Sequence, residues 1–151
     1  MSNATDGPGG PVGADGPGGP VGADGPGGTV LGVGTDLVEV SRLSAALERT
    51  PALLHRLFTP AEQARCNRNK DPLPHLAARF AAKEAVMKSL GAGMSAMAFT
   101  DIEVVSGADG APGVRLSGRA RQVAERRGVA TVLVSLTHTG DLAQAHAVAC
   151  T

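Results

Sequence analysis

The helical spacing of apolar residues in one segment constrains the fold of this chain more than any other feature. The segment is PLPHLAARFAAKEAVMKSLG, residues 72–91. At about 100° per residue, its large apolar side chains project within about 80° of one another. These side chains belong to Leu76, Phe80, Met87 and Leu90. Gly91 can end such a helix in the left-handed conformation. The pattern therefore predicts one long helix over about 72–90 that packs against a core.

Three charged residues of this helix lie unusually close to its apolar face. Lys83 projects inside the apolar stripe, Glu84 projects at its edge, and Lys88 follows one turn later. An ionised carboxylate at the margin of buried surface costs several kcal/mol unless it has a partner. The simplest explanation is an ion pair between Glu84 and Lys88, worth about 0.3–0.5 kcal/mol if exposed. The functional alternative is a carboxylate held in place for a metal ion.

The remaining pattern predicts a compact α+β fold with an antiparallel sheet. Thr59 and Glu62 have the spacing of a capping box, and Ser41 can cap a helix over 42–49. Pro51 is expected to open a further short helix. We expect another helix over 118–127, and strands over 30–40, 100–105, 113–116, 130–138 and 142–149. The last two strands form a terminal hairpin.

The first 28 residues have a different composition from the rest. Residues 6–28 repeat DGPGGPVGA twice and begin a third copy, with Gly at every third position from 7 to 28. This period permits a collagen-like stalk, but the run is short and its third positions lack Pro, so a disordered extension is favoured. A translation start near Val30 is a third alternative. We therefore divide the chain into a disordered Gly/Pro-rich tail, 1–28, and a folded domain, 29–151.

Composition excludes several classes of protein. Once the three acidic residues of the tail are set aside, 14 basic and 11 acidic residues remain, and the chain has no Trp, no Tyr and three Phe. This weak charge and the few stacking side chains argue against nucleic-acid binding. Two cysteines without a CxxC pattern indicate reduced thiols and a cytoplasmic location. No apolar run reaches the roughly 18 residues of a membrane span, and the first residues lack the basic and apolar regions of a secretion signal, so we expect none.

Two further polar positions can complete a site. Asp36 follows two glycines in GVGTD, where it is either a turn former or a functional carboxylate. Placed beside Glu84, it would create an oxygen-rich site suited to Mg²⁺. His138, in SLTHT, shares a strand face with the apolar residues before it and is expected on the core side. A lone histidine in that position is more often structural than catalytic.

Four segments together resemble the holo-acyl-carrier-protein synthases, which are small 4′-phosphopantetheinyl transferases. They are GVGTDLVEVSRL (32–43), FTPAE (58–62), RFAAKEAVMKSLG (79–91) and SLTHT (135–139). The resemblance covers about Val30 to Ala149, and RFAAKEA is its most specific part. Members of this family transfer 4′-phosphopantetheine from coenzyme A (CoA) to a serine of an apo-acyl carrier protein and release adenosine 3′,5′-bisphosphate. The resemblance implies the 4′-phosphopantetheinyl transferase fold.

The resemblance also implies roles for individual residues. Asp36 and Glu84 would bind Mg²⁺ at the CoA pyrophosphate, and Glu84 would accept the serine proton directly or through a metal-bound water. Lys88 would hold the leaving 5′-phosphate and protonate it, which completes a catalytic set with Asp36 and Glu84. The candidates for binding the CoA phosphates are Arg79, Lys83, Lys88 and His138.

The expected partners follow from the same resemblance. Arg42, Arg49 and Arg56 recur at spacings of seven and would face an acidic carrier protein, although a solvated arginine edge explains them equally well. Family members form homotrimers with the CoA site between subunits. Two rival functions are a catalytically silent module that binds CoA or carrier protein, and a Mg²⁺-dependent phosphotransferase for another nucleotide. The second would call for a GxxxxGK[ST] loop, which the sequence lacks.

Overall fold

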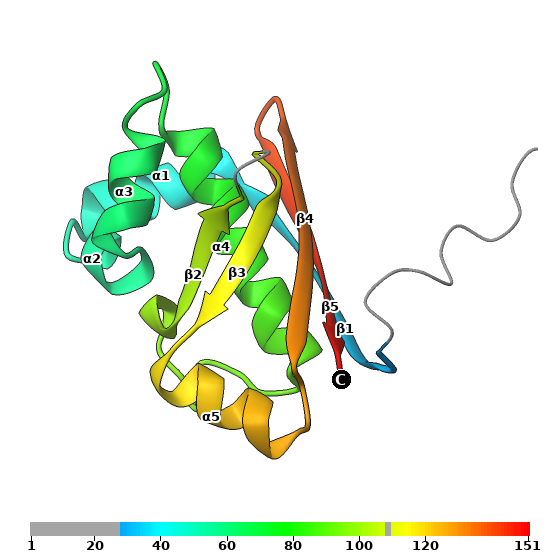
Figure 1. Ribbon diagram of the computed structural model, residues 1–151. Helices are drawn as coiled ribbons and strands as arrows, with labels where there is room; N and C mark the ends of the chain where they lie inside the picture. Colours follow the sequence, from blue (N-terminus) through cyan, green and yellow to red (C-terminus); the bar gives the residue numbers. More distant parts are fainter. Residues whose placement is uncertain (1–27, 108–109) are drawn as a thin grey trace, which may run out of the picture.

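A three-stranded antiparallel sheet and one long helix form the centre of the molecule (Figure 1). The computed structural model describes residues 28–107 and 110–151. The sheet has the order β1 (Val30–Glu39), β5 (Leu142–Cys150), β4 (Thr131–Thr139), and α4 (Leu73–Ser89) crosses one of its faces. The expected α+β class, with an antiparallel sheet and a long packed helix, is confirmed.

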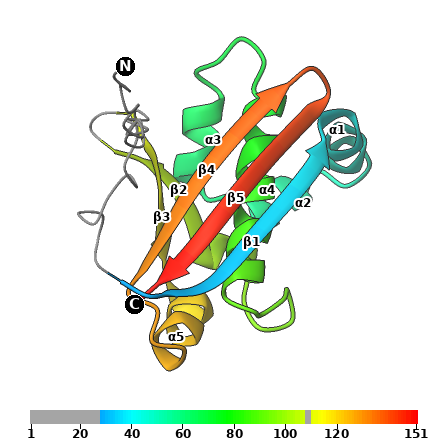
Figure 2. The same ribbon diagram turned by 90° about the vertical axis from the view of Figure 1, so that its right-hand side faces the viewer.

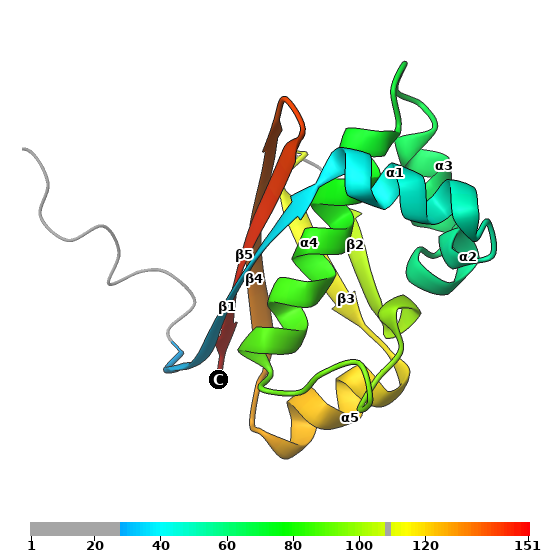
Figure 3. The same cartoon turned by 180° about the vertical axis from the view of Figure 1, so that it is seen from behind.

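The other elements surround α4. The helices α1 (Val40–Arg49), α2 (Leu53–Leu57) and α3 (Pro60–Cys66) gather near its start, whereas α5 (Gly118–Arg126) lies beyond its end (Figure 3). A short 3₁₀ turn, η1 (Phe99–Asp101), leads into the hairpin of β2 (Ile102–Ser106) and β3 (Pro112–Leu116). Because β3 lies next to β4, this hairpin covers another side of α4.

Helix α4 is buried on more sides than its apolar stripe predicts. Leu76 and Met87 are buried as expected, but so are the small residues between the large ones. These are Ala77, Ala78, Ala81, Ala82 and Ala85. The facing positions of β5 are also alanines and are fully buried at 143, 145, 147 and 149. Small side chains on both surfaces let the helix lie close to the sheet, so the single-stripe prediction was incomplete.

The contact between α4 and β1 depends on two glycines. A Cβ added at Gly34 would lie 1.9 Å from the carbonyl oxygen of Ala85, and one at Gly32 would lie 2.0 Å from that of Ser89. Neither oxygen can move without bending the helix, so only glycine allows this approach. Asp36 follows Gly34 by two residues and so lies on the same face of β1, the face that α4 covers.

The start of α1 differs from the prediction. Ser41 does not cap it, because the helix begins at Val40. Instead, Asp141 in the β4–β5 turn accepts hydrogen bonds from the Ser41 backbone N–H (2.8 Å) and from its hydroxyl. A residue 100 positions away thus supplies the acceptor that a local cap would provide. The short helix expected at Pro51 begins two residues later, at Leu53.

The other expected elements occur within a few residues of their predicted bounds. The capping box of Thr59 and Glu62 is present, and Gly91 ends α4 with a φ of 57°. The predicted tail lies outside the described residues except for Gly28, as do residues 108–109 between β2 and β3. No helix in the described part of the chain is long and apolar enough to cross a membrane.

The sheet face opposite α4 is uncovered in the described part of the chain (Figure 2). Large apolar side chains lie exposed on it, with Val33 at 66% and Leu37 at 60% of full exposure. Leu31 of β1 and Leu133 of β4 extend the same surface. We call this set the open sheet face.

Replacing Gly34 by Ala is expected to lower the free energy of unfolding by about 3 kcal/mol or more, because the new methyl group meets helix backbone. Gly93→Ala is the matched control, since a Cβ there has no atom within 4 Å. Urea unfolding of both variants checks this. Equal stability of the two variants would contradict the close approach of α4 to β1.

Candidate functional site

A pocket of about 980 Å³ opens between β1, α1, α2 and α4. Asp36 and Glu84 both line it, as do Arg42 and Arg56. The apolar part of its wall comes from Leu53, Leu57, Phe80, Met94, Met97 and Phe99. The rings of Phe80 and Phe99 are stacked in this wall with centroids 5.4 Å apart. Glu39 lines it as well, so one pocket combines three acidic residues, two basic residues and an apolar surface.

Asp36 and Lys88 form an ion pair at this site. Lys88 Nζ donates to Asp36 Oδ1 at 2.9 Å and to the carbonyl oxygen of Thr35 at 2.8 Å. The ion pairs of the described residues do not include the expected pair of Glu84 with Lys88. Lys88 reaches instead across the helix–strand contact, since Gly34 brings β1 so close. Its ammonium thus occupies a place where a metal cation could sit.

Glu84 carries an energetic penalty when it is ionised. Partial burial raises the pKa of its carboxyl group, the negative charge of Asp36 raises it further, and Lys88 acts in the opposite direction. The influence of Asp36 means that the two carboxylates are near enough to repel each other. A bound cation would remove this repulsion.

Lys83 lies in the protein interior rather than in this pocket. Its ammonium is fully buried and donates to Glu62 Oε2 at 2.7 Å and to the carbonyl oxygens of Leu57 and Phe99. All three of its N–H groups are therefore used within the protein. Burial lowers the pKa of Lys83, and Glu62 works against this shift. This geometry does not agree with the expected contact between Lys83 and CoA phosphates.

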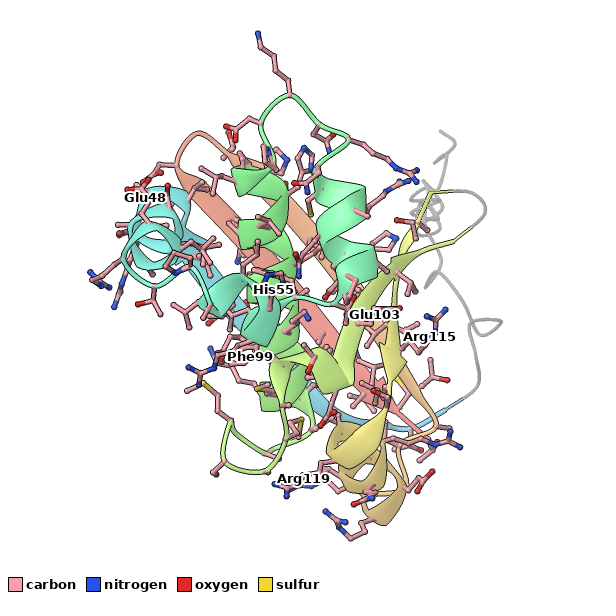
Figure 4. All side chains as sticks on the ribbon, turned by 90° about the vertical axis from the view of Figure 1, so that its left-hand side faces the viewer. Glu48, His55, Phe99, Glu103, Arg115 and Arg119 are labelled. Atoms are coloured by element: carbon pink, nitrogen blue, oxygen red, sulfur yellow. The ribbon has the colours of Figure 1, made fainter. Side chains whose placement is uncertain are left out.

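Glu62 offsets the energetic cost of burying the Lys83 ammonium. Its carboxylate also accepts from the backbone N–H groups of Thr59 (2.9 Å) and Val104 (3.0 Å). A neighbouring acid, Glu103, accepts from the Thr59 hydroxyl and pairs with Arg115 across the β2–β3 hairpin (Figure 4). FTPAE thus contains the counter-ion of Lys83, a role that the capping-box pattern alone did not reveal.

Arg79 and His138 lie on another flank of α4. The residues lining the pocket of Asp36 and Glu84 include neither of them. His138 lies on β4, at the sheet edge opposite to β1, and its ring contacts that of His75 at the start of α4. His138 is thus on the α4 side of the sheet as expected, although it is exposed. The sequence-based prediction did not include His75. Its position one helical turn before Arg79, which the prediction did include, was the signal that could have indicated it.

The three arginines expected to face a carrier protein do not all lie at the pocket. Arg42 and Arg56 line the pocket, whereas Arg49 is exposed at the end of α1 outside it. Arg42 and Arg49 lie on α1 and Arg56 lies on α2. Because the chain breaks between these helices, the spacing of seven does not give one continuous helical stripe.

The acidic pair fits a hard divalent cation. The described residues contain no group of three or more His, Cys, Asp or Glu that could hold a metal ion. Mg²⁺ needs fewer protein ligands, because it usually keeps several waters and takes substrate phosphates as further ligands. Two carboxylates that repel each other in an open pocket match this preference.

Comparison with known proteins identifies the family of the chain. Residues 32–151 match the model of the 4'-phosphopantetheinyl transferase superfamily. The chain belongs to this superfamily. A holo-[acyl-carrier-protein] synthase from Desulforudis audaxviator is 51% identical over 121 residues, covering 80% of this chain and 92% of the relative.

Solved structures of superfamily members have the same fold. The holo-[acyl-carrier-protein] synthase of Neisseria meningitidis has a TM-score of 0.74 at 31% identity, covering 80% of this chain and 98% of that one. The Helicobacter pylori synthase in complex with coenzyme A has a TM-score of 0.68 at 27% identity, covering 78% and 98% of the two chains.

Glu84→Gln is expected to stabilise the fold at pH 7–8. Because the folded state raises the pKa of Glu84, it binds more protons than the unfolded state, so stability falls as pH rises from about 4.5 through the folded pKa. The neutral amide avoids this loss. Thermal unfolding at pH 4 and pH 8 measures the effect. The control is Glu48→Gln, at an exposed position of α1 (Figure 4). A lower melting temperature for Glu84→Gln at pH 8 would contradict the stated cause.

Proposed function

We propose that this chain transfers 4′-phosphopantetheine from coenzyme A to a serine of an apo-acyl carrier protein and releases adenosine 3′,5′-bisphosphate. The observation that carries the proposal is the meeting of Asp36 and Glu84 in one pocket with Arg42 and Arg56. Membership of the superfamily and the names of the relatives support the same activity. The bond that breaks lies in a pyrophosphate, so the site has to neutralise phosphate charge and activate a hydroxyl group.

Asp36 and Glu84 would hold Mg²⁺, which would neutralise charge that develops on the pyrophosphate. Lys88, now paired with Asp36, would transfer its contact to the leaving 5′-phosphate and donate a proton to it. Glu84 would accept the serine proton, directly or through water.

We further propose that the complete site forms between subunits of a homotrimer. Arg79 and His138 remain candidates for CoA phosphates, but they lie on a different flank of α4 from the acidic pair. A neighbouring subunit that presents this flank to the pocket of Asp36 would bring both groups to one CoA molecule. The open sheet face supplies an exposed apolar surface for such an assembly.

The carrier protein would meet the chain at Arg42 and Arg56. Both arginines line the pocket, so an acidic partner held there would present its serine to the proposed metal site. Arg49 would add attraction at longer range. The apolar wall of Phe80, Phe99 and their neighbours suits the uncharged pantetheine arm.

The rival functions have less support. A silent binding module has no use for two repelling carboxylates next to Lys88, because removing that repulsion would stabilise it. A phosphotransferase of the P-loop type has no loop of the required pattern. We place the reaction in the cytoplasm, in agreement with two cysteines that are both free thiols.

The purified chain, with CoA and Mg²⁺, is expected to add one phosphopantetheine group to at least one of several apo carrier proteins. Mass spectrometry of the carrier proteins reads the reaction, and a chelator should stop it. Glu84→Gln should lower kcat by at least about 100-fold, because it removes both a metal ligand and the proton acceptor. Glu48→Gln serves as the matched control. Near-normal turnover by Glu84→Gln would refute the metal assignment.

Reversing the charge of Arg42 is expected to raise the KM for the carrier protein about tenfold, while the Kd for CoA stays unchanged. The reason is that the arginine faces an acidic partner rather than the nucleotide. Arg119→Glu on α5, which does not line the pocket, is the control (Figure 4). An equal effect of both variants would point to general electrostatics and against a docking site at Arg42.

Val33→Asp is expected to dissociate the proposed trimer, because it places a charge on the open sheet face. Sedimentation equilibrium measures the mass of the variant and of the wild type. Gln122→Asp, at an exposed position of α5, should leave the assembly intact. A wild-type chain that sediments as a monomer would contradict the proposed assembly.

A further inference from the structure

Two histidine rings meet on the flank of α4 that faces β4. His75 lies in the first turn of α4, and His138 lies next to the last residue of β4. Their ring centroids are 5.0 Å apart, and the ring planes cross at 77°, which is an edge-to-face contact. His138 is exposed at this point, whereas His75 is partly buried. The contact therefore holds an exposed ring against a more enclosed one.

The surroundings of this pair are mostly cationic. Arg79 lies one turn after His75 and donates from Nη1 to the His75 carbonyl oxygen at 3.3 Å. On the α3 side, the Arg79 guanidinium contacts the buried thiol of Cys66, with Arg65 nearby. Arg79 Nε is buried and has no hydrogen-bond partner among the described residues. The acidic group that acts on His75 is Asp71, just before the helix.

We propose that His75 is a positioning residue for His138, and that the His75 imidazole, beside Arg79, takes up a proton when this flank binds a phosphate group of CoA. This inference rests on the proposed function, which assigns Arg79 and His138 to CoA phosphates. His75 would not touch the reacting atoms. It would act through the ring contact and through its own charge.

The proton uptake follows from the charges around His75. Burial lowers its pKa, and the charges of His138 and Arg79 lower it further, against the opposite effect of Asp71. His75 is therefore mostly neutral near pH 7. A phosphate dianion favours the protonated form of a nearby imidazole, so binding and protonation strengthen each other. CoA should consequently bind more tightly as the pH falls from 8 to 6.

Two substitutions separate the ring contact from the charge. His75→Phe keeps an aromatic ring against His138 but cannot take up a proton. His75→Ala loses both. Calorimetry gives the Kd of wild type and variants for CoA at pH 6, 7 and 8, and transfer assays give kcat at saturating CoA. His55→Phe on α2 is the matched control (Figure 4). The phosphate of CoA also titrates near pH 6, but it does so equally in every protein compared.

At pH 8, His75→Phe should have a Kd for CoA within twofold of wild type, and its Kd should change less than that of wild type between pH 8 and pH 6. His75→Ala should bind CoA about fivefold more weakly than wild type at pH 8 and by a larger factor at pH 6, with kcat within twofold of wild type. His55→Phe should match the wild type throughout. Folding of each variant is verified by circular dichroism.

A wild-type pH profile for His75→Phe, or a wild-type Kd for His75→Ala, would overturn this inference while leaving the proposed function intact. A wild-type chain that binds no CoA would instead overturn the proposed function, and the inference would fall with it.

Discussion

The buried ion pair of Lys83 and Glu62 determines how α4 is oriented in the structure. It joins α4 to α3, and the same carboxylate continues to β2 through the Val104 backbone. A buried ammonium without its counter-ion would cost several kcal/mol, so the helix cannot rotate away from this contact. Glu84 follows Lys83 by one residue and therefore projects about 100° further round the helix, toward β1. The position of the candidate catalytic acid is thus a consequence of where its neighbour is buried.

The second requirement is the close approach of α4 to β1. Gly32 and Gly34 remove the side chains that would separate the two elements, and Asp36 then comes near Glu84 and Lys88. The result is a local arrangement that is unfavourable for an isolated protein, since two carboxylates repel each other in a partly buried place. Such strain is typical of sites whose ligands complete the charge balance.

The sequence predicts much of this arrangement, and its failures have physical causes. Strong periodicity and turn residues located the elements, because these signals act within a few residues. The partners of Ser41, Lys83 and Lys88 were missed because each one lies far along the chain. Alanines contributed little to the apolar stripe, although they form much of the helix–sheet contact. The pairing of Asp36 with Glu84 came from the family resemblance, and the shared pocket now gives it a geometric basis.

The most direct measurement for the central claim is a crystal structure of the chain with CoA and Mn²⁺, with the ion located by its anomalous signal. The account predicts one ion that is bound by oxygens of both Asp36 and Glu84 and by the CoA pyrophosphate, with Lys88 released from Asp36. An ion bound elsewhere, with the Lys88–Asp36 pair intact while CoA is present, would contradict it.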